Sequence, residues 1–265
     1  MTDDFFHMPI INRGKSIWPE QFPEEVIQRL RLKVGEFAFM SQMMLEFYDT
    51  NSTVFKEEQI VHYDDDIIVH HHNNEILYLL NEEKLHRGGC FWDPSLGKSN
   101  SDASVVAFVF VNDETQHYFV HEMFYLDFSS FYSQEDFRNQ IRTVILKIKQ
   151  LKLNHIFVEV NGIGALIPTL MKQVAKDMKF KLYIEPYFSK TSKVMRIFET
   201  LEPLITSKSI LFHSRVLRTP FIQEFVDFSL AKKDQKDDGL DALTMALKHS
   251  LRVLPRFEGR VLFSN

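Results

Sequence analysis

The sequence is poor in cysteine, with Cys90 as the only one in 265 residues. A disulfide framework is therefore excluded, and a buried thiol in a reducing cytosol is the simplest interpretation of Cys90. The sequence also lacks any run of about 20 apolar residues, which a membrane-spanning helix would need. Its first residues carry no basic segment ahead of an apolar stretch. We therefore expect a cytosolic protein without a membrane partner.

Positive charge is also scarce, because the formal net charge is −5. Proteins that coat nucleic acid need clustered lysine and arginine, so this class is disfavoured. An enzyme that contacts DNA through a local basic strip remains compatible with this charge. Apolar residues make up 45% of the chain and include 25 phenylalanines. That content is ample for a buried core and excludes a disordered chain.

The chain divides near residue 80. Residues 1–80 are predicted to be a helical extension and linker: one amphipathic helix begins at Pro23, and a second helical stretch covers 37–47. Short apolar strings broken by acidic and histidine runs follow, which predicts an irregular linker. His70–His72 are expected in a solvated loop, because adjacent histidines on an irregular stretch cannot all face one ion.

Residues 81–265 alternate between strand and helix patterns. Three apolar segments joined by short links predict an antiparallel meander, and helices and strands then alternate to the end. The predicted strands are 88–94, 103–111, 117–126, 155–160, 181–185 and 210–212, and the predicted helices are 134–151, 163–178, 190–206, 220–230 and 237–251. A meander followed by crossover strands predicts an α/β fold, a mixed sheet with helices on both faces.

Acidic residues stand at the ends of these elements. Asp93 ends the first strand of the meander, and Glu159 lies within the apolar strand 155–160. Asp237, Asp238 and Asp241 open the last long helix. An ionised carboxylate in a buried strand is unfavourable unless it is paired or binds a cation. Oxygen ligands alone favour Mg²⁺ or Mn²⁺, and two such ions about 3.5–4 Å apart can hydrolyse a phosphodiester bond.

Each acid also has a structural explanation. Glu159 could pair with a lysine at a strand end, and Asp93 could be an ordinary turn residue before Pro94. Asp237 and Asp238 could complement the dipole of the helix that they begin. The combination of acids on successive elements favours the metal site over these separate explanations.

Four short motifs in series resemble those of a known family. They are Trp-Asp-Pro-Ser (92–95) with Ser-Asp-Ala-Ser-Val (101–105), an acidic strand with an Asn-Gly turn (157–164), a basic helix start (190–197), and Asp-Asp-Gly-Leu-Asp-Ala-Leu (237–243). Together they resemble the nuclease domain of the large terminase subunits of tailed phages, which is ribonuclease H-like. Residues 17–42 are similar to the segment that closes the family's ATPase domain and leads to the nuclease.

The resemblance implies an endonuclease that cleaves double-stranded DNA with two Mg²⁺ or Mn²⁺ ions during viral genome packaging. Carried over by position, the core catalytic ligands would be Asp93, Glu159 and Asp238. The further metal ligands would be Asp241, Asp102 and Asp237, and the sequence leaves open which acid of the last helix is the main third ligand. The DNA phosphates would be contacted by Lys98, Lys190, Lys193 and Arg196, although a solvated helix face remains an alternative for those on the helix.

The resemblance also implies partners: a terminase ATPase domain, a small terminase subunit and a portal, in the host-cell cytosol. The ATPase would be supplied separately or lost, because Gly97-Lys98-Ser99 lacks the first glycine of a phosphate-binding loop, whose place Trp92 takes. Two other functions stay open. One is a Holliday-junction resolvase, and the other is a non-catalytic prophage remnant or portal-docking module.

Overall fold

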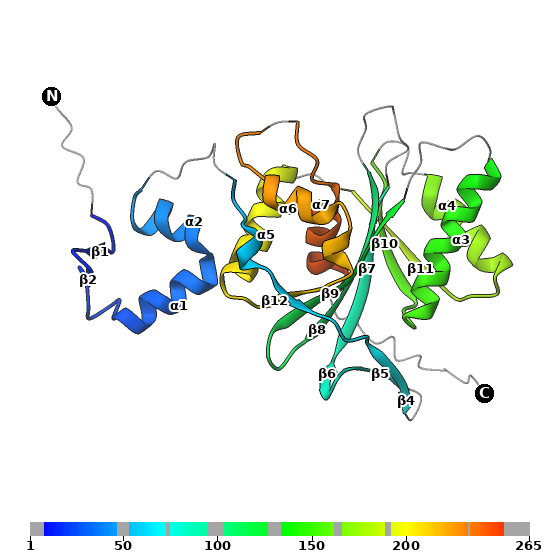
Figure 1. Ribbon diagram of the computed structural model, residues 1–265, viewed down its shortest axis with the longest axis horizontal. Helices are drawn as coiled ribbons and strands as arrows, with labels where there is room; N and C mark the ends of the chain where they lie inside the picture. Colours follow the sequence, from blue (N-terminus) through cyan, green and yellow to red (C-terminus); the bar gives the residue numbers. More distant parts are fainter. Residues whose placement is uncertain are drawn as a thin grey trace, which may run out of the picture.

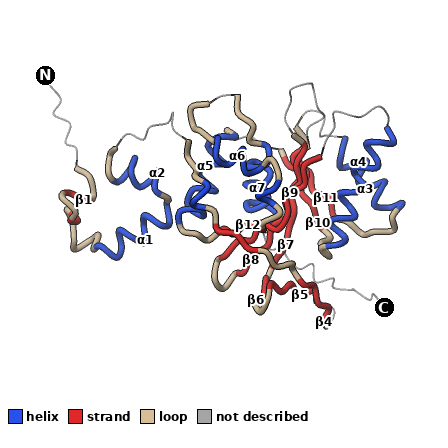
Figure 2. Tube along the Cα trace, in the orientation of Figure 1, coloured by secondary structure: helices blue, strands red, loops and turns tan. Residues whose placement is uncertain are grey.

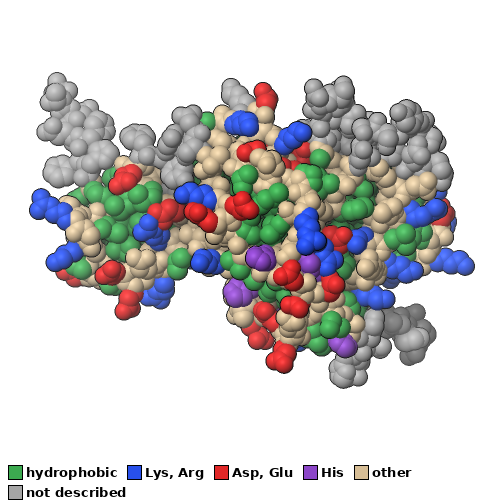
Figure 3. All heavy atoms as spheres, viewed as in Figure 1, with side chains coloured by type: hydrophobic (Ala, Val, Ile, Leu, Met, Phe, Trp, Pro, Cys, Tyr) green, Lys and Arg blue, Asp and Glu red, His purple; other side chains and the backbone are tan. Residues whose placement is uncertain are grey.

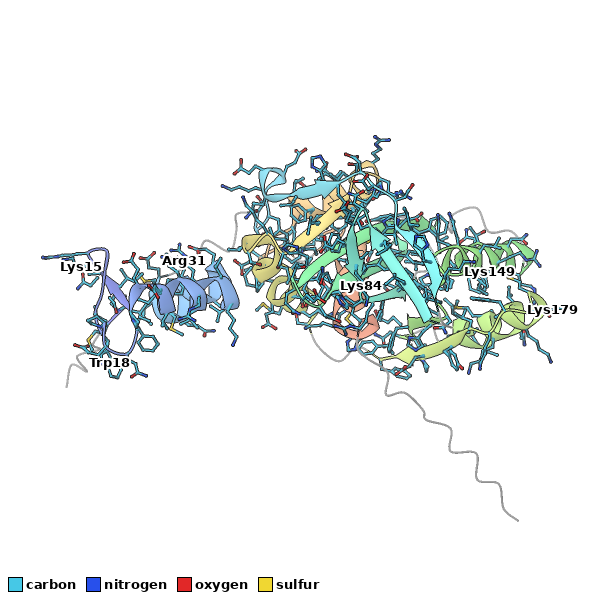
Figure 4. The ribbon with its side chains drawn as sticks, turned by 90° about the horizontal axis from the view of Figure 1, so that it is seen from below. Lys15, Trp18, Arg31, Lys84, Lys149 and Lys179 are labelled. Atoms are coloured by element: carbon cyan, nitrogen blue, oxygen red, sulfur yellow. The ribbon has the colours of Figure 1, made fainter. Side chains whose placement is uncertain are left out.

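The computed structural model describes residues 8–46, 53–72, 75–94, 103–126, 134–161, 166–188, 192–232 and 234–251 (Figure 1). A central sheet separates two groups of helices, and the N-terminal elements lie beyond one of these groups. A view from below gives the same order: Lys15, Trp18 and Arg31 lie at one end of the molecule, and Lys149 and Lys179 at the other (Figure 4). None of the described helices is long and apolar enough to cross a membrane.

The N-terminal elements contact the rest of the protein through helix α5. They are β1 (Ile11–Asn12), β2 (Lys15–Ser16), α1 (Glu24–Val34), α2 (Glu36–Ala38) and a π-helical turn, η1 (Phe39–Met43). The predicted first helix is confirmed, and the second helical stretch is the short pair α2 and η1. Gly35, with φ of 84°, separates α1 from α2. The Glu202 carboxylate of α5 occupies the space of a Cβ at Gly35 and accepts a hydrogen bond from the Glu36 amide at 2.6 Å.

The segment expected to be an irregular linker instead forms strands. A 3₁₀ turn, η2 (Glu57–Gln59), leads into β3 (Val61–Tyr63), and β4 (Ile68–His72), β5 (Glu75–Leu80) and β6 (Glu83–Leu85) make a small antiparallel sheet. His70–His72 therefore lie in a strand rather than in a loop. The apolar segments are short because the strands β3 to β6 are only three to six residues long. Strand β3 pairs with β12, which lies about 150 residues later in the sequence.

The central sheet has the strand order β11-β10-β7-β8-β9-β12-β3 (Figure 2). Its other strands are β7 (Arg87–Asp93), β8 (Ser104–Asn112), β9 (His117–Leu126), β10 (His155–Glu159), β11 (Tyr183–Tyr187) and β12 (Ile210–His213). Strands β7, β8 and β9 form the predicted antiparallel meander. Strands β10 and β11 run parallel to β7, and β12 and β3 run parallel to β9. The predicted mixed sheet is confirmed.

Helices cover both faces of this sheet (Figure 1). Helices α3 (Gln134–Gln150) and α4 (Ile167–Asp177) cover one face, and α5 (Lys193–Thr206), α6 (Phe221–Asp227), α7 (Asp238–Met245) and the turns η4 (Val216–Arg218) and η5 (Ala246–Ser250) lie on the other. Neighbouring strand residues alternate between the two cores: Phe91 packs under α5–α7, and Trp92 packs under α3 and α4. All nine residues of β8 are buried, which explains its continuous apolar sequence. Cys90 is fully buried, as expected.

The topology also brings strand ends together. Strands β7 and β10 are parallel, with Trp92 opposite Val158, so their carboxyl ends meet at one edge of the sheet. Asp93 and Glu159 are the last residues of these strands. Helix α7 packs across β7 and β8, and its acidic first turn faces the same edge.

Candidate metal centre

Three carboxylates from separate elements lie together at this edge. Asp93 comes from β7, Glu159 from β10 and Asp241 from α7, and one ligand oxygen of each lies within 4.8 Å of those of the other two. Glu159 and Asp241 are buried, with exposed fractions of 8% and 1%, and Asp93 is half-buried. The group offers oxygen ligands from several sides, which is the arrangement that a hard divalent cation requires.

The proximity of these acids changes their acidity. Burial, and then the negative charges of Asp241 and Glu159, raise the pKa of Asp93 well above its usual range. Burial and the charge of Asp241 likewise raise the pKa of Glu159, against the opposing effects of Arg196, Lys193 and a hydrogen bond from Asn161. The cluster therefore carries more negative charge than its surroundings neutralise.

Arg196 of α5 is paired with one of the three acids. Its Nε lies 2.7 Å from Oδ1 of Asp241, and its Nη2 lies 2.5 Å from Oδ2. Although burial opposes it, the hydrogen bond with Asp241 raises the pKa of Arg196 above its usual value. The guanidinium is 7% exposed, so it is part of the site's interior and not of a solvated helix face.

Lys193 lies one helical turn before Arg196 and is paired with the other two acids at the start of α7, the N-cap residue Asp237 and Asp238. Its Nζ lies 2.7 Å from Oδ1 of Asp237 and 2.7 Å from Oδ1 of Asp238. The second carboxylate oxygen of Asp238 accepts a hydrogen bond from the Ala103 amide at 2.6 Å. Burial disfavours the charged ammonium, but Asp238 and Asp237 more than compensate and raise the pKa of Lys193.

The first turn of α7 is capped by a residue of another helix. Asp237 is the N-cap residue, but its side chain makes no capping hydrogen bond. Oε2 of Glu224, on α6, accepts hydrogen bonds from the amides of Gly239 at 2.7 Å and Leu240 at 3.3 Å. The Tyr125 hydroxyl donates to Oε1 at 2.9 Å. Burial is the main reason that the pKa of Glu224 rises to about 7.

The structure brings most of the predicted site residues together. Asp93, Glu159 and Asp241 form the close group, and Asp237 and Asp238 stand beside it with Lys193. Asp102, Lys98 and Lys190 lie outside the described residues. The sequence interpretation did not include Glu224 or Tyr125, and no local pattern signals either. The pairing of Lys193 and Arg196 with the acids had one signal: they are three residues apart and so share a helix face.

A family model matches the middle of the chain. Residues 99–210 match the model described as Terminase Bacteriophage T7, Ribonuclease H-like domain. Residues 99–210 are thus similar to a terminase ribonuclease H-like domain. The predicted resemblance to terminase nuclease domains and the predicted fold class are confirmed. The match includes Glu159, and Asp93 and Asp241 lie outside its two ends. The fold is one used by metal-dependent nucleases, which are hydrolases of phosphodiester bonds.

Among solved structures, the chain is similar to several nucleic-acid-processing proteins. The human cytomegalovirus terminase nuclease domain, soaked with Mn, has 12% identity over 74% of this chain and 94% of its own, with a TM-score of 0.48. The P22 large terminase nuclease domain has 10% identity over 62% and 83%, with a TM-score of 0.45. RuvC of T. thermophilus, in complex with a Holliday junction substrate, has 12% identity over 60% and 92%, with a TM-score of 0.37. No curated protein matches the sequence.

Proposed function

We propose that this protein is an endonuclease that cleaves double-stranded DNA by two-metal hydrolysis during viral genome packaging. The observation that carries the proposal is the convergence of Asp93, Glu159 and Asp241 from three elements. It occurs in a chain whose residues 99–210 match a terminase ribonuclease H-like domain. This convergence supports an assignment of the three acids as metal ligands of a nuclease of this type.

Mg²⁺ or Mn²⁺ fits this set of side chains. All three donors are carboxylate oxygens, which hard divalent cations prefer. The raised pKa values of Asp93 and Glu159 indicate an excess of negative charge that a cation would relieve. Asp93, Glu159 and Asp241 would hold one ion. Bound ions of this kind polarise the scissile phosphate and lower the pKa of the attacking water.

The chain's own residues would prepare these ligands. Arg196 fixes both oxygens of Asp241, and the Asn161 amide donates a hydrogen bond to Oε1 of Glu159 at 2.5 Å. These contacts orient the two carboxylates before a substrate arrives, which is the usual work of groups behind a metal ligand. We propose Asp238 and Asp237 as ligands of the second ion. When bound, that ion would replace Lys193 as the positive charge that neutralises these two acids. Asp102 remains a candidate for a further ligand.

DNA contacts are proposed for lysines around the site. On the face seen in Figure 3, acidic and basic side chains are interspersed rather than gathered by sign, which suits local phosphate contacts better than a broad basic surface. Lys98 and Lys190 are the proposed phosphate partners. Lys193 and Arg196 are paired with carboxylates, which favours a role for both in neutralising the acidic residues. Either side chain would contact a DNA phosphate only after releasing its carboxylate partner.

The biological setting is part of the same proposal. A terminase ATPase domain, a small terminase subunit and a portal are the partners that genome packaging implies. The resemblance of residues 17–42 to the end of an ATPase domain supports the first of them. The contact of α1 and α2 with α5 would connect such a domain to the helix that carries Lys193 and Arg196.

Cleavage of supercoiled plasmid tests the proposal. The full chain is incubated with EDTA, Mg²⁺ or Mn²⁺, beside Asp93→Asn and a control, Asp177→Asn, which changes an exposed acid of α4 paired with Arg138. We expect nicking and linearisation with either metal and none with EDTA. Only Asp93→Asn should lose at least about 1,000-fold in rate, because it removes a proposed ligand of the first ion and two-metal hydrolysis needs both ions.

Substrate preference separates the related functions. We expect linear duplex to be cut at least as well as a four-way junction of the same sequence. A strong preference for the four-way junction would contradict a packaging nuclease and favour a Holliday-junction resolvase. No cleavage by folded protein with either metal would reject the catalytic function and leave a non-catalytic module.

A further inference from the structure

The start of α7 has an unusual arrangement that the metal ligands alone do not explain. The first amide groups of a helix have no partner within the helix, and the N-cap side chain usually accepts a hydrogen bond from one of them. Asp237 holds the N-cap position of α7 but makes no such bond. Its carboxylate is directed to Lys193 instead, at 2.7 Å. The residue best placed to cap α7 therefore pairs with Lys193 beside the acidic group.

Glu224 takes over the cap from outside the helix. One of its carboxylate oxygens accepts from the amides of Gly239 and Leu240, which are the second and third residues of α7. The other oxygen accepts from the Tyr125 hydroxyl of β9. Glu224 is 5% exposed, so the carboxylate connects α6, α7 and the sheet inside the protein. A buried anion at a helix N-terminus is also favoured by the helix dipole.

The packing around this cap leaves no spare room. A Cβ at Gly239 would lie 2.0 Å from the Tyr125 hydroxyl oxygen and 2.8 Å from Oε2 of Glu224. Gly239 stands directly after Asp238 and two residues before Asp241. The absence of a side chain at Gly239 is thus what lets the carboxylate and the hydroxyl approach the backbone between the two acids.

We infer that Glu224 is a positioning residue, whose carboxylate caps α7 in place of Asp237 and thereby fixes Asp238 and Asp241 for divalent-metal binding. This inference rests on the proposed function, because it assigns Glu224 to the same metal site. In this role Glu224 would neither touch the substrate nor hold the metal. It acts through the backbone of α7, as a group behind the ligands.

Mn²⁺ binding to the full chain, measured by calorimetry without DNA, tests this role. We expect Glu224→Ala to weaken Mn²⁺ binding by about 10-fold or more, the usual effect of losing a group behind metal ligands. Glu224→Gln keeps an acceptor oxygen of the same reach, so its Mn²⁺ affinity should stay close to that of the unaltered protein. The matched control is Glu202→Gln, another buried glutamate that accepts a backbone hydrogen bond, from the Glu36 amide, and it should leave Mn²⁺ binding unchanged.

The Mn²⁺ dependence of plasmid cleavage gives a second measurement. For Glu224→Ala we expect a higher Mn²⁺ concentration at half-maximal rate, with much of the rate recovered at saturating metal. A folded Glu224→Ala protein with unchanged Mn²⁺ affinity would overturn the inference. If Glu224→Ala does not fold, Glu224→Asp provides the test, because aspartate keeps the charge but is too short to reach the same amides. Unchanged Mn²⁺ affinity in Glu224→Asp would also overturn the inference. Unaltered protein that binds no Mn²⁺ would instead overturn the metal-dependent function itself.

Discussion

Arg196 and Asp241 form a bidentate ion pair inside the protein, with donor–acceptor distances of 2.7 and 2.5 Å. The side chains are 7% and 2% exposed. Because water can solvate neither charge well, either one left without its partner would destabilise the folded protein. Asp241 also belongs to the group that could hold a metal ion. The Asp241 carboxylate therefore pairs with Arg196 on one side and, in our proposal, binds a cation on the other.

The first prediction concerns the loss of this arginine. Arg196→Ala leaves a buried carboxylate without its partner, which typically costs about 3–5 kcal/mol of unfolding free energy. We expect a loss of this size in urea denaturation with EDTA. Added Mn²⁺ should restore part of the stability, because a cation that binds only the folded state stabilises it.

Arg138→Ala is the control for the arginine variant. Arg138 pairs with Asp177 at 2.8 Å, but both side chains are more exposed, so its loss should cost no more than about 1 kcal/mol. Equal losses in the two variants, or an Arg196→Ala protein that Mn²⁺ does not stabilise, would contradict the view of Asp241 as a shared partner.

The second prediction is that Asp93→Asn stabilises the metal-free protein. The pKa of Asp93 is raised by burial and by Asp241 and Glu159, so its ionised form opposes folding at neutral pH. An amide of the same shape removes that repulsion. In calorimetry at pH 7.5 with EDTA, we expect a higher Tm for Asp93→Asn than for the unaltered protein. With saturating Mn²⁺ the order should reverse, and an unchanged order would count against a metal ligand at this position.

Much of the fold could be predicted from the sequence because its signals are local. The meander and the apolar face of α3 follow from residue patterns within each element. Asp93 is visible as an acid at a strand end, and Glu159 as an acid inside an apolar strand. The contacts that were not predicted join distant parts of the chain. Strand β3 pairs with β12, and Glu224 reaches α7 from another helix.

The choice of the proposed third ligand shows a different limit. Asp238 and Asp241 are one turn apart on the same helix face, so the sequence pattern treats them alike. Their contacts differ because of α5: Lys193 pairs with Asp238, and Arg196 pairs with Asp241. The rotation and depth of α7 relative to β7 and β10 place Asp241 beside Asp93 and Glu159. That placement depends on tertiary packing, which no spacing rule within the helix contains.

The third prediction is a pH dependence of stability that involves Glu224. Its pKa is about 7 in the folded protein against 4.5 for an ordinary glutamate, so the folded state binds the proton more tightly than the unfolded state. The stabilising contribution is therefore fully present below about pH 4.5 and is lost as the pH rises towards 7. Urea denaturation of the metal-free protein between pH 4.5 and 8 should show this decline.

Glu224→Gln should flatten that decline, because the amide does not titrate. Some slope should remain from Asp93 and Glu159, whose pKa values are raised in the same direction. Glu199→Gln, on the exposed side of α5, is the control and should keep the full slope. If Glu224→Gln and the control give the same pH profile, Glu224 does not titrate in this window.

The fourth prediction concerns the start of the ribonuclease H-like domain, which the sequence placed at residue 81. Phe55 is 2% exposed, and its ring stacks on Phe225 at 4.9 Å and on Phe228 at 5.4 Å. The Val54 amide also donates a hydrogen bond to the Phe228 carbonyl oxygen at 2.8 Å. Residues 53–63 are therefore packed against α6 and β12. A fragment of residues 53–265 should fold, whereas 81–265 should expose this apolar surface and aggregate.

A point substitution tests the same packing without truncation. Phe55→Ala removes a fully buried ring and should cost about 3–5 kcal/mol of unfolding free energy. Phe188→Ala, with a ring that is 62% exposed, should change it by no more than about 0.5 kcal/mol. Urea denaturation of both variants, beside the solubility and circular dichroism of the two fragments, measures the effect. A soluble, folded 81–265 fragment with full Mn²⁺ affinity would return the boundary to residue 81, and Phe55 would then belong to a separate, dispensable extension.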